Sequence, residues 1–457
     1  MTDTIAAIST GMSASGIGIV RLSGADAREI AARIYRSKNG KKKIDQVPSH
    51  TIHHGFIYDG EEVIDEVLVM IMDAPKSYTG ENTVEINCHG GVLAVKKVLE
   101  TIIKCGGRPA EPGEFTKRAF LNGKMDLSQA EAVTDLIHAK SEYALKSSVS
   151  QLRGSVLHSI EGIRKKIIYH IAFIEAALDD PEHISIDGYK EELKKDVEDQ
   201  KKKIRQLLSS YDEGKMMKEG IKTVILGKPN AGKSSLLNRF VREERAIVTD
   251  VAGTTRDVLE ETVLLQGIAL RIIDTAGIRD AGDIVEQIGV EKAKKIAEDA
   301  DLILYVADSS IPLDQNDEEI IKLLKNRNAL VLLNKTDLGT VLTEEILKEK
   351  LDRPILAISA KEGSGIDELE EKIKDMFFSG DISFNEEVYI TNARHKAALI
   401  EAEKSLELVE NSIAAKLPED FYSIDLMNAY EVLGSIIGES VGEDLINEIF
   451  SKFCMGK

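Results

Sequence analysis

The chain has 457 residues, 43% of them hydrophobic and 30% charged, which is an ordinary globular composition over more length than one hydrophobic core usually supports. Residues 1–8 lack the features of a secretion signal, and no apolar run is long enough to span a membrane, so a cytoplasmic protein is expected. The formal charge of −19 opposes attraction of the whole molecule to nucleic acid, so an RNA partner requires a local basic patch or a second protein.

The first region, residues 1–119, mixes short apolar strands with glycine punctuation. Candidate strands cover residues 17–22 and 67–72, and glycine pairs at 90–91 and 106–107 mark turns. This pattern predicts a compact α+β domain.

The second region, residues 120–216, is predicted to be helical. Ser128 followed by Glu131 matches a capping box, and apolar residues then recur at helical spacing. A further helix is indicated by an apolar stripe on a Lys/Glu-rich background, formed by Leu193, Val197, Ile204, Leu208 and Tyr211.

From residue 217 to 380, strands alternate with helices, which is typical of a doubly wound sheet. The candidate strands are residues 223–226, 269–273, 302–307, 330–333 and 355–358. The remainder, 381–457, is helical again, with stripes at Leu399, Ala402, Leu406 and Val409 and at Leu445, Ile449 and Phe453. We therefore predict a multidomain α/β protein in which the doubly wound domain is inserted into one discontinuous all-α domain, 120–216 plus 381–457.

The inserted domain carries a phosphate-binding loop. Its sequence is Gly227-Lys228-Pro229-Asn230-Ala231-Gly232-Lys233-Ser234, placed between an apolar strand and a predicted helix. The glycines let successive backbone N–H groups turn toward phosphates, Lys233 supplies a cation, and the Ser234 hydroxyl is suited to Mg²⁺. The segment predicts a P-loop, Ras-like nucleotide site.

Two later motifs predict that the base is guanine. Asn334-Lys335-Thr336-Asp337 follows an apolar strand, and the Asp337 carboxylate can accept hydrogen bonds from the guanine ring N–H and exocyclic amine, which adenine lacks. Ser359-Ala360-Lys361, after the next strand, supplies the third side of a base pocket. Each string alone is compatible with turn chemistry, but the ordered set predicts a GTP-binding and GTP-hydrolysing protein and disfavours a P-loop kinase.

Two segments are predicted to respond to the γ-phosphate. In Asp274-Thr275-Ala276-Gly277, the carboxylate can hold a metal ion through water and the Gly277 amide can sense the phosphate. In residues 253–257, Thr255 is favoured over Thr254 as a second Mg²⁺ ligand. The predicted GTP-binding residues are Asn230, Ala231, Gly232, Lys233, Ser234, Ser235, Thr249, Asp250, Val251, Ala252, Gly253, Thr254, Thr255, Asp274, Thr275, Ala276, Gly277, Asn334, Lys335, Asp337, Ser359, Ala360 and Lys361.

The catalytic group has to come from outside these motifs. Ile278 stands where Ras-type proteins place the glutamine that orients the attacking water. Glu286 is the candidate replacement, and a solvated carboxylate in a loop is the alternative interpretation.

The chain resembles the bacterial tRNA uridine-modification GTPase family known as MnmE or TrmE over essentially its whole length. The resemblance is carried by residues 18–24 (GIVRLSG), 78–81 (YTGE) with Glu85 and 89–91 (HGG), 112–124 (PGEFTKRAFLNGK), the GTPase motifs and the terminal Cys454-Met455-Gly456-Lys457. It implies a homodimer, formed through a folate-binding-like N-terminal domain, that assembles with the flavoprotein MnmG (GidA) into a heterotetramer.

The implied activity is GTP hydrolysis that drives addition of a carboxymethylaminomethyl or aminomethyl group to C5 of the tRNA wobble uridine. The one-carbon unit comes from 5-formyl- or methylene-tetrahydrofolate, and FAD and NADH are expected on the partner. The resemblance assigns the folate to Arg21, Glu85, Lys124 and Lys457, and a K⁺ ion to Asn230, Thr249, Val251 and Thr254.

In this family the potassium ion becomes competent when two GTPase domains meet, and Glu286 then orients the water. Cys454 matches a terminal cysteine proposed as catalytic; a packed thiol at a helix end is the alternative. The sequence after it lacks the aliphatic pair of a prenylation box, so lipidation is disfavoured.

A GTP-dependent RNA or ribosome-assembly switch without modification chemistry is the rival interpretation. Such a protein is expected to carry a basic RNA-binding domain. This acidic sequence shows neither the loop of a KH domain in context nor the aromatic signature of an RRM.

Overall fold

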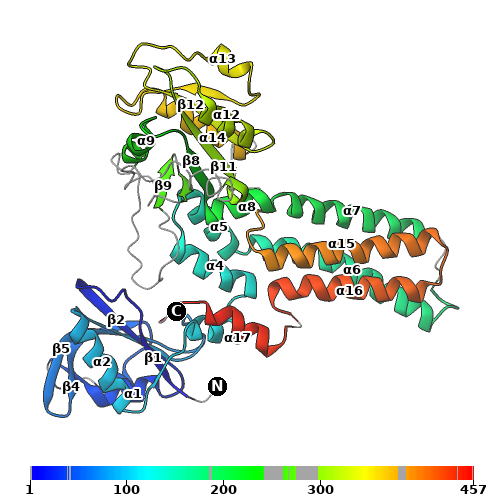
Figure 1. The fold of residues 1–457 in the computed structure, drawn as a ribbon. Helices are drawn as coiled ribbons and strands as arrows, with labels where there is room; N and C mark the ends of the chain where they lie inside the picture. Colours follow the sequence, from blue (N-terminus) through cyan, green and yellow to red (C-terminus); the bar gives the residue numbers. More distant parts are fainter. Residues whose placement is uncertain are drawn as a thin grey trace. The chain divides into compact units, whose positions relative to one another are not determined.

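A computed structural model describes residues 3–38, 40, 43–184, 188–240, 261–265, 267–273, 297–378, 388–439, 441–454 and 456 (Figure 1). The chain forms two compact units. The first comprises Met1–Thr134, Gln151–Lys201 and Ala398–Lys457, and the second Asp135–Ser150 and Lys202–Ala397. Each unit is built on its own β-sheet.

The first unit contains a seven-stranded sheet with the order β3-β4-β5-β6-β2-β1-β7. Neighbouring strands are antiparallel, except that β1 and β7 are parallel. The predicted strands 17–22 and 67–72 are confirmed as parts of β2 and β5. The strands are β1 (Ile5–Ile8), β2 (Ser15–Ser23), β3 (Tyr35–Ser37), β4 (Thr51–Asp59), β5 (Glu62–Met72), β6 (Thr83–Gly90) and β7 (Arg108–Pro109).

Two helices, α1 (Ala27–Ile34) and α2 (Val92–Lys104), pack on this sheet. Their apolar residues, such as Ile30 and Val98, share one buried core with strand residues such as Val20 and Ile86. A short 3-10 helix, η1 (Ile44–Gln46), contributes Ile44 to the same core. Helix α3 (Glu114–Leu121) follows β7 and begins after Gly113, which has a φ of +69°.

Helices from the two ends of the chain lie side by side in the first unit (Figure 1). α6 packs along α16, and Lys201 of α7 forms a 2.6 Å ion pair with Glu410 of α15. Among the described residues, none of the helices combines the length and apolarity needed to cross a membrane. The helices that follow α3, some of which extend into the second unit, are α4 (Leu127–His138), α5 (Glu142–Leu152), α6 (Ser155–Asp179), α7 (Tyr189–Ser209), α15 (Ala393–Ala414), α16 (Glu419–Ile437) and α17 (Glu443–Ser451).

Three helix predictions need correction. The capping box of α4 is formed by Asp126 and Gln129. The Asp126 carboxylate accepts from the backbone N–H groups of Ser128 and Gln129, and the Gln129 side chain accepts from the Asp126 N–H. Ser128 lies buried inside the helix. The stripe that included Tyr211 spans two helices, because α7 ends at Ser209. In α17 the buried face is Ile446 and Phe450, while Leu445 is exposed. The stripe in α15 is confirmed: Leu399, Ala402, Leu406 and Val409 are all 0% exposed.

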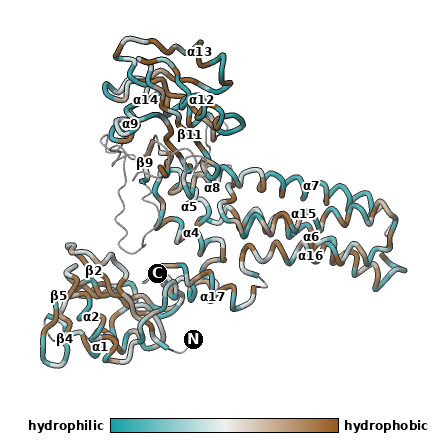
Figure 2. Tube along the Cα trace, in the orientation of Figure 1, coloured by the Kyte–Doolittle hydropathy of each residue, from teal (hydrophilic) through white to brown (hydrophobic). Residues whose placement is uncertain are grey.

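The second unit contains a six-stranded sheet with the order β13-β12-β11-β8-β10-β9, all parallel except the edge strand β9. All five predicted strands are confirmed, and β9 is an addition. Figure 2 shows the apolar character of β11, whose residues are all buried. The elements are α8 (Tyr211–Glu219), β8 (Ile221–Leu226), α9 (Lys233–Phe240), β9 (Glu261–Leu265), β10 (Ile268–Ile272), β11 (Leu302–Asp308), α12 (Gln315–Leu324), β12 (Ala329–Asn334), α13 (Glu344–Lys348), β13 (Ile355–Ala357) and α14 (Ile366–Phe377).

The strand order of this sheet reverses at β8. The chain leaves β8 for β9 and β10 on one side and then continues with β11, β12 and β13 on the other. In open α/β sheets, ligands bind outside the carboxyl ends of the strands at such a switch point. The multidomain α/β fold class predicted from the sequence is therefore present, with a position prepared for a ligand at the end of β8.

Candidate functional site

The phosphate-binding loop connects β8 to α9 at the switch point. Gly227 has a φ of +151° and Gly232 a φ of +104°, backbone conformations that favour glycine. A side chain at Gly227 would collide with the Val306 carbonyl oxygen, and one at Gly232 with the Asn334 amide nitrogen. Both glycines are therefore required by the close approach of β11 and β12 to the loop.

Lys233, the first residue of α9, folds back over this loop. Its Nζ donates to the carbonyl oxygens of Gly227 at 2.6 Å and Lys228 at 2.7 Å. Burial lowers the pKa of Lys233, and no carboxylate contributes an opposing upward shift. An anionic phosphate would offer this ammonium group a stronger partner than two neutral carbonyls.

Lys228 anchors the other side of the loop. Its Nζ lies 2.7 Å from Asp317 and 3.0 Å from Asp314, the two carboxylates of the capping box of α12. Asp317 also accepts a 2.7 Å hydrogen bond from the buried Tyr305 hydroxyl. The loop is thus tied to both a helix end and the core of β11.

Asn334 connects the phosphate-binding loop to the predicted base-reading segments. Its side-chain amide donates to the Ala231 carbonyl at 2.8 Å and accepts from the Ala360 backbone N–H at 2.9 Å. Asn334 is only 2% exposed. Three motifs are therefore joined through one buried side chain, whose backbone partners Ala231 and Ala360 lie 129 residues apart in sequence.

Asp337 is exposed at the edge of this cluster. Its carboxylate accepts a 2.7 Å hydrogen bond from the Ser359 hydroxyl, and this bond is the main reason that the pKa of Asp337 is lowered. Lys335 has a φ of +66° and pairs with Asp308 at 2.5 Å. An ionised, oriented carboxylate in this position is suited to accept two N–H groups of a base.

Ser234 and Ser235, at the start of α9, and Asn230, with a φ of +62°, are exposed on the loop and helix, and Lys361 is exposed beside Ala360. Within the described ranges, no group of three or more His, Cys, Asp or Glu side chains forms a metal cluster. The other predicted nucleotide and catalytic residues lie outside the described residues, namely Thr249, Asp250, Val251, Ala252, Gly253, Thr254, Thr255, Asp274, Thr275, Ala276, Gly277 and Glu286.

A second polar cluster lies on the sheet of the first unit. Arg21 of β2 and Glu85 of β6 are paired in register, and Arg21 Nε lies 2.8 Å from the Glu85 carboxylate. The guanidinium also lies 5.4 Å from the Tyr78 ring centroid and 5.6 Å from that of Phe115. Arg21 Nη1 is buried without a hydrogen-bond partner in the described part of the chain. A buried N–H of this kind is suited to a polar ligand.

Lys124 does not contact Arg21 or Glu85 directly. Its Nζ donates to the Pro75 carbonyl at 3.1 Å, and its methylene stem lies against Gly80. Both positions belong to the loop that carries Tyr78, the residue that lies beside Arg21. The structure therefore brings Arg21 and Glu85 together and places Lys124, in the connection between α3 and α4, against the loop that carries Tyr78.

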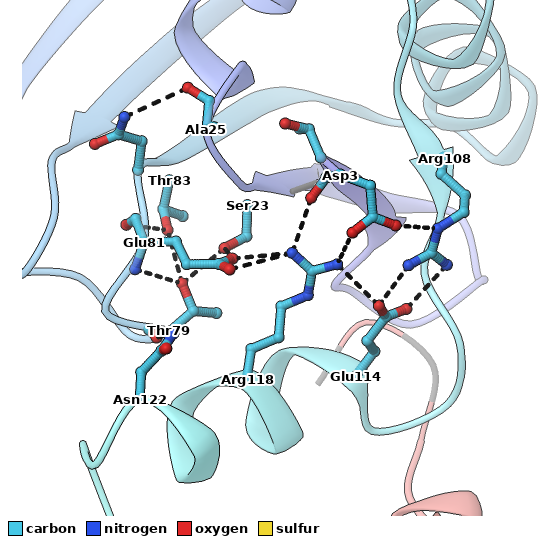
Figure 3. Close-up of polar contacts among 12 residues, drawn as sticks. Asp3, Ser23, Ala25, Thr79, Glu81, Thr83, Arg108, Glu114, Arg118 and Asn122 are labelled. Atoms are coloured by element: carbon cyan, nitrogen blue, oxygen red, sulfur yellow. Dashed lines mark hydrogen bonds and ion pairs between the residues drawn. The ribbon is translucent and has the colours of Figure 1, made fainter. Parts of the chain in front are cut away.

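A buried charge network supports this loop (Figure 3). Arg118 of α3 is 1% exposed and lies within 3.2 Å of the carboxylates of Asp3, Glu81 and Glu114. Arg108 pairs with Asp3 and Glu114 as well. The network joins the start of the chain, the loop before β6 and α3, and so fixes the surroundings of the Arg21 cluster.

The end of the chain lies beside the same sheet. The Cys454 carbonyl accepts from Gly113 N–H at 3.3 Å, and the Gly456 carbonyl accepts from the Ser9 hydroxyl at 3.1 Å. Ser9 directly follows β1, in which Ala7 is paired with Arg21. Cys454 itself is exposed, and Lys457 lies outside the described residues.

Sequence reasoning missed Arg118, Tyr78 and the Asp308–Lys335 pair. The first two stand inside the family motifs quoted above, but no spacing rule assigns them a contact. Their roles depend on long-range pairing between α3, the loop before β6 and the sheet, which sequence spacing does not show.

Comparisons with known proteins agree with this architecture. Residues 4–124 match the family described as GTP-binding protein TrmE N-terminus, and residues 127–454 match the MnmE helical domain. Proteins named tRNA modification GTPase MnmE are 59% identical in Lachnoclostridium phytofermentans, over 100% of both chains, and 48% identical in Enterococcus faecalis, over 100% of this chain and 98% of the relative.

Among solved structures, the G domain of the T. maritima FeoB iron transporter is 27% identical, with a TM-score of 0.26, and the match covers 34% of this chain and 97% of that one. The full-length identity and the two family matches together assign the protein: the chain belongs to the MnmE (TrmE) family.

Proposed function

We propose that this chain is a K⁺-dependent GTP hydrolase that, together with the flavoprotein MnmG (GidA), installs a carboxymethylaminomethyl or aminomethyl group at C5 of the tRNA wobble uridine. Membership in a family of tRNA modification GTPases supports the hydrolase and the RNA substrate. The observation that carries the nucleotide assignment is Asn334, which joins the phosphate-binding loop to the base-reading segments.

In this proposal the loop N–H groups and Lys233 hold the phosphates, and Asp337 with Ser359 selects guanine. Water attacks the γ-phosphorus, the bond to the β–γ bridging oxygen breaks, and GDP and phosphate leave. Glu286 orients the water. Mg²⁺ at Ser234 and Thr255, and K⁺ at Asn230, Thr249, Val251 and Thr254, would neutralise charge that develops on the phosphate oxygens.

A tetrahydrofolate derivative is proposed to bind near Arg21, Glu85 and Lys124, with Lys457 contributing, and would supply the one-carbon unit. Two features fit such a ligand. The Arg21 Nη1 group is buried without a partner among the described residues, and the Glu85 carboxylate beside it can accept from pterin N–H groups. Lys124, exposed on the neighbouring loop, suits the anionic glutamate tail.

The proposed division into domains follows the sequence: residues 1–119 bind folate and dimerise, 120–216 and 381–457 form the helical domain, and 217–380 hydrolyse GTP. We further propose a cytoplasmic homodimer that joins MnmG, with its FAD and NADH, in a heterotetramer acting on tRNA. Cys454 is proposed as a thiol that takes part in the modification, with a packing role as the alternative.

The test is a mass profile of wobble nucleosides from cells that lack this chain and from the same cells complemented with it. The proposal predicts loss and recovery of the C5-modified uridine. An unchanged profile, combined with intact GTP turnover by the purified protein, would favour the rival switch function. In the same preparation, GTP turnover in K⁺ should greatly exceed turnover in Na⁺, and equal rates would remove the potassium assignment.

A further inference from the structure

Arg239, near the end of α9, lies against the turn that follows β13 in the second unit. A Cβ atom added at Gly363 would lie 2.2 Å from Arg239 Nη2 and 2.7 Å from its Cζ, so the guanidinium packs directly on the glycine backbone. Gly363 also has a φ of +89°, a conformation that favours glycine. Arg239 is half-buried, and its Nε atom is buried. The side chain is therefore held against the turn instead of extending into solvent.

Helix α9 gives this side chain a rigid base. Phe240, the residue after Arg239, is 1% exposed and belongs to the same core cluster as Ala360. The helix begins at Lys233, in the phosphate-binding loop. Arg239 therefore connects the helix of the phosphate-binding loop to the turn that follows the base-reading segment of Ala360.

The turn under the guanidinium is joined to Asp337 by consecutive hydrogen bonds. The Gly363 N–H donates to the Ser359 carbonyl at 2.7 Å, and the Ser359 N–H donates to the Ser364 carbonyl at 3.0 Å. The Ser359 hydroxyl in turn donates to the Asp337 carboxylate at 2.7 Å. The position of Gly363 therefore sets the position of Ser359, and the Ser359 hydroxyl sets the orientation of the carboxylate.

We propose that Arg239 is a positioning residue for guanine recognition and acts on the Asp337 carboxylate through Gly363 and Ser359. The inference rests on the proposed function for the assignment of guanine to Asp337. A carboxylate that accepts both the ring N–H and the exocyclic amine of one base must keep a fixed orientation, because hydrogen bonds weaken steeply when they are misaligned. A guanidinium suits the supporting role, since its planar, rigid head packs flat on a backbone segment, which the flexible ammonium of lysine does not.

The test measures the affinities of the full-length protein for GDP and for IDP, which lacks the exocyclic amine of guanine, by competition against a fluorescent GDP analogue. The variant is R239A. The matched control is R327A, because Arg327 is also half-buried but lies in the turn before β12, at the amino end of that strand. Both nucleotides are titrated against the same preparation, so a change in folding stability affects both dissociation constants alike and cancels in their ratio.

We expect the wild type to prefer GDP over IDP by at least about tenfold, the contribution of one hydrogen bond to a charged group. R239A should lose at least half of that free energy, which lowers the ratio by about threefold or more. R327A should keep the wild-type ratio.

The variant G363A tests the contact itself. Its added methyl group would displace the Arg239 guanidinium, so G363A should lower the ratio as well, and R239A should have little further effect in the G363A background. Effects of the two substitutions that simply multiply would show that Arg239 does not act through Gly363, and would overturn the inference.

A ratio that is unchanged in R239A, or equally lowered in R327A, would also overturn the role of Arg239 while leaving the proposed guanine site intact. A wild type without a preference for GDP over IDP would instead refute the base pocket of the proposed function, and this role with it.

Discussion

Replacing Asn334 with alanine removes a buried side chain that joins the phosphate-binding loop to the base-reading segments. The Ala231 carbonyl and the Ala360 N–H then lose their hydrogen-bond partner. Asn334 itself is only 2% exposed, so the position is buried. An unsatisfied buried backbone group costs about 1–3 kcal/mol. Two such groups together cost about 2–6 kcal/mol, and the prediction uses the lower part of that range, about 2–3 kcal/mol.

This loss should appear in nucleotide affinity, since both segments contact the nucleotide in the proposed site. Each 1.4 kcal/mol corresponds to about a tenfold change in the dissociation constant, so Asn334→Ala should bind GDP about 30- to 150-fold more weakly. The assay is titration of the purified protein with a fluorescent GDP analogue. Asn316→Ala, the same substitution at an exposed position of α12, is the matched control. If the two variants bound GDP equally well, the bridging role of Asn334 would be refuted.

Three further outcomes follow from the same contacts. Arg118→Met leaves three carboxylates around an uncharged side chain and should lower the free energy of unfolding by about 3–5 kcal/mol in a denaturant titration, whereas Arg33→Met, at a 58% exposed side chain, should have little effect. Burial raises the pKa of Glu114, but hydrogen bonds from Arg108, the Glu111 N–H and Arg118 outweigh it and hold the pKa below 4.5. The free energy of unfolding that this carboxylate contributes above pH 4.5 should therefore be lost as the pH falls through the folded-state pKa. Acid titration of unfolding should show a smaller loss in Glu114→Gln than in the wild type. Glu286→Ala should reduce GTP turnover far more than GTP affinity, and equal losses in both would exclude a water-orienting role.

The sheet of the second unit was predictable because its strands are nearly continuous apolar runs. Residues 302–307 and 330–333 are buried on both faces, and short apolar runs of this kind that alternate with helices are typical of central parallel strands. The edge strand β9 was missed, since among the described strands it pairs with β10 alone and its burial is mixed. Its hairpin to β10 is visible in sequence only through Gly267, which has a φ of +84°.

Helix phase and helix starts were harder to predict. Around α4, both Asp126 and Ser128 are residues that favour an N-cap, and the sequence pattern alone does not choose between them. In α17, Leu445 and Ile446 are both apolar, so two adjacent faces compete, and packing against Leu127 and Ala130 of α4 decides in favour of Ile446 and Phe450. Tertiary packing resolved both cases.

In the candidate site, too, some residues could be predicted from the sequence and others could not. Gly227, Asn334 and Asp337 were visible because a phosphate and a base impose fixed residue types at fixed distances from strand ends. Arg118 and Tyr78 were not, because their partners come from distant segments. The Asn334 bridge lies between these cases: the residue was predicted, but its hydrogen bonds to Ala231 and Ala360 were not.

The most direct test of the central claim is the nucleotide preference of Asp337→Asn. The claim is that one exposed carboxylate, oriented by Ser359, selects guanine for a phosphate loop at the end of β8. Dissociation constants for GTP and XTP should show that the wild type prefers GTP and that the variant prefers XTP, because an amide can donate to the extra oxygen of xanthine where a carboxylate cannot. An unchanged preference for GTP in Asp337→Asn would contradict the assignment of the base pocket.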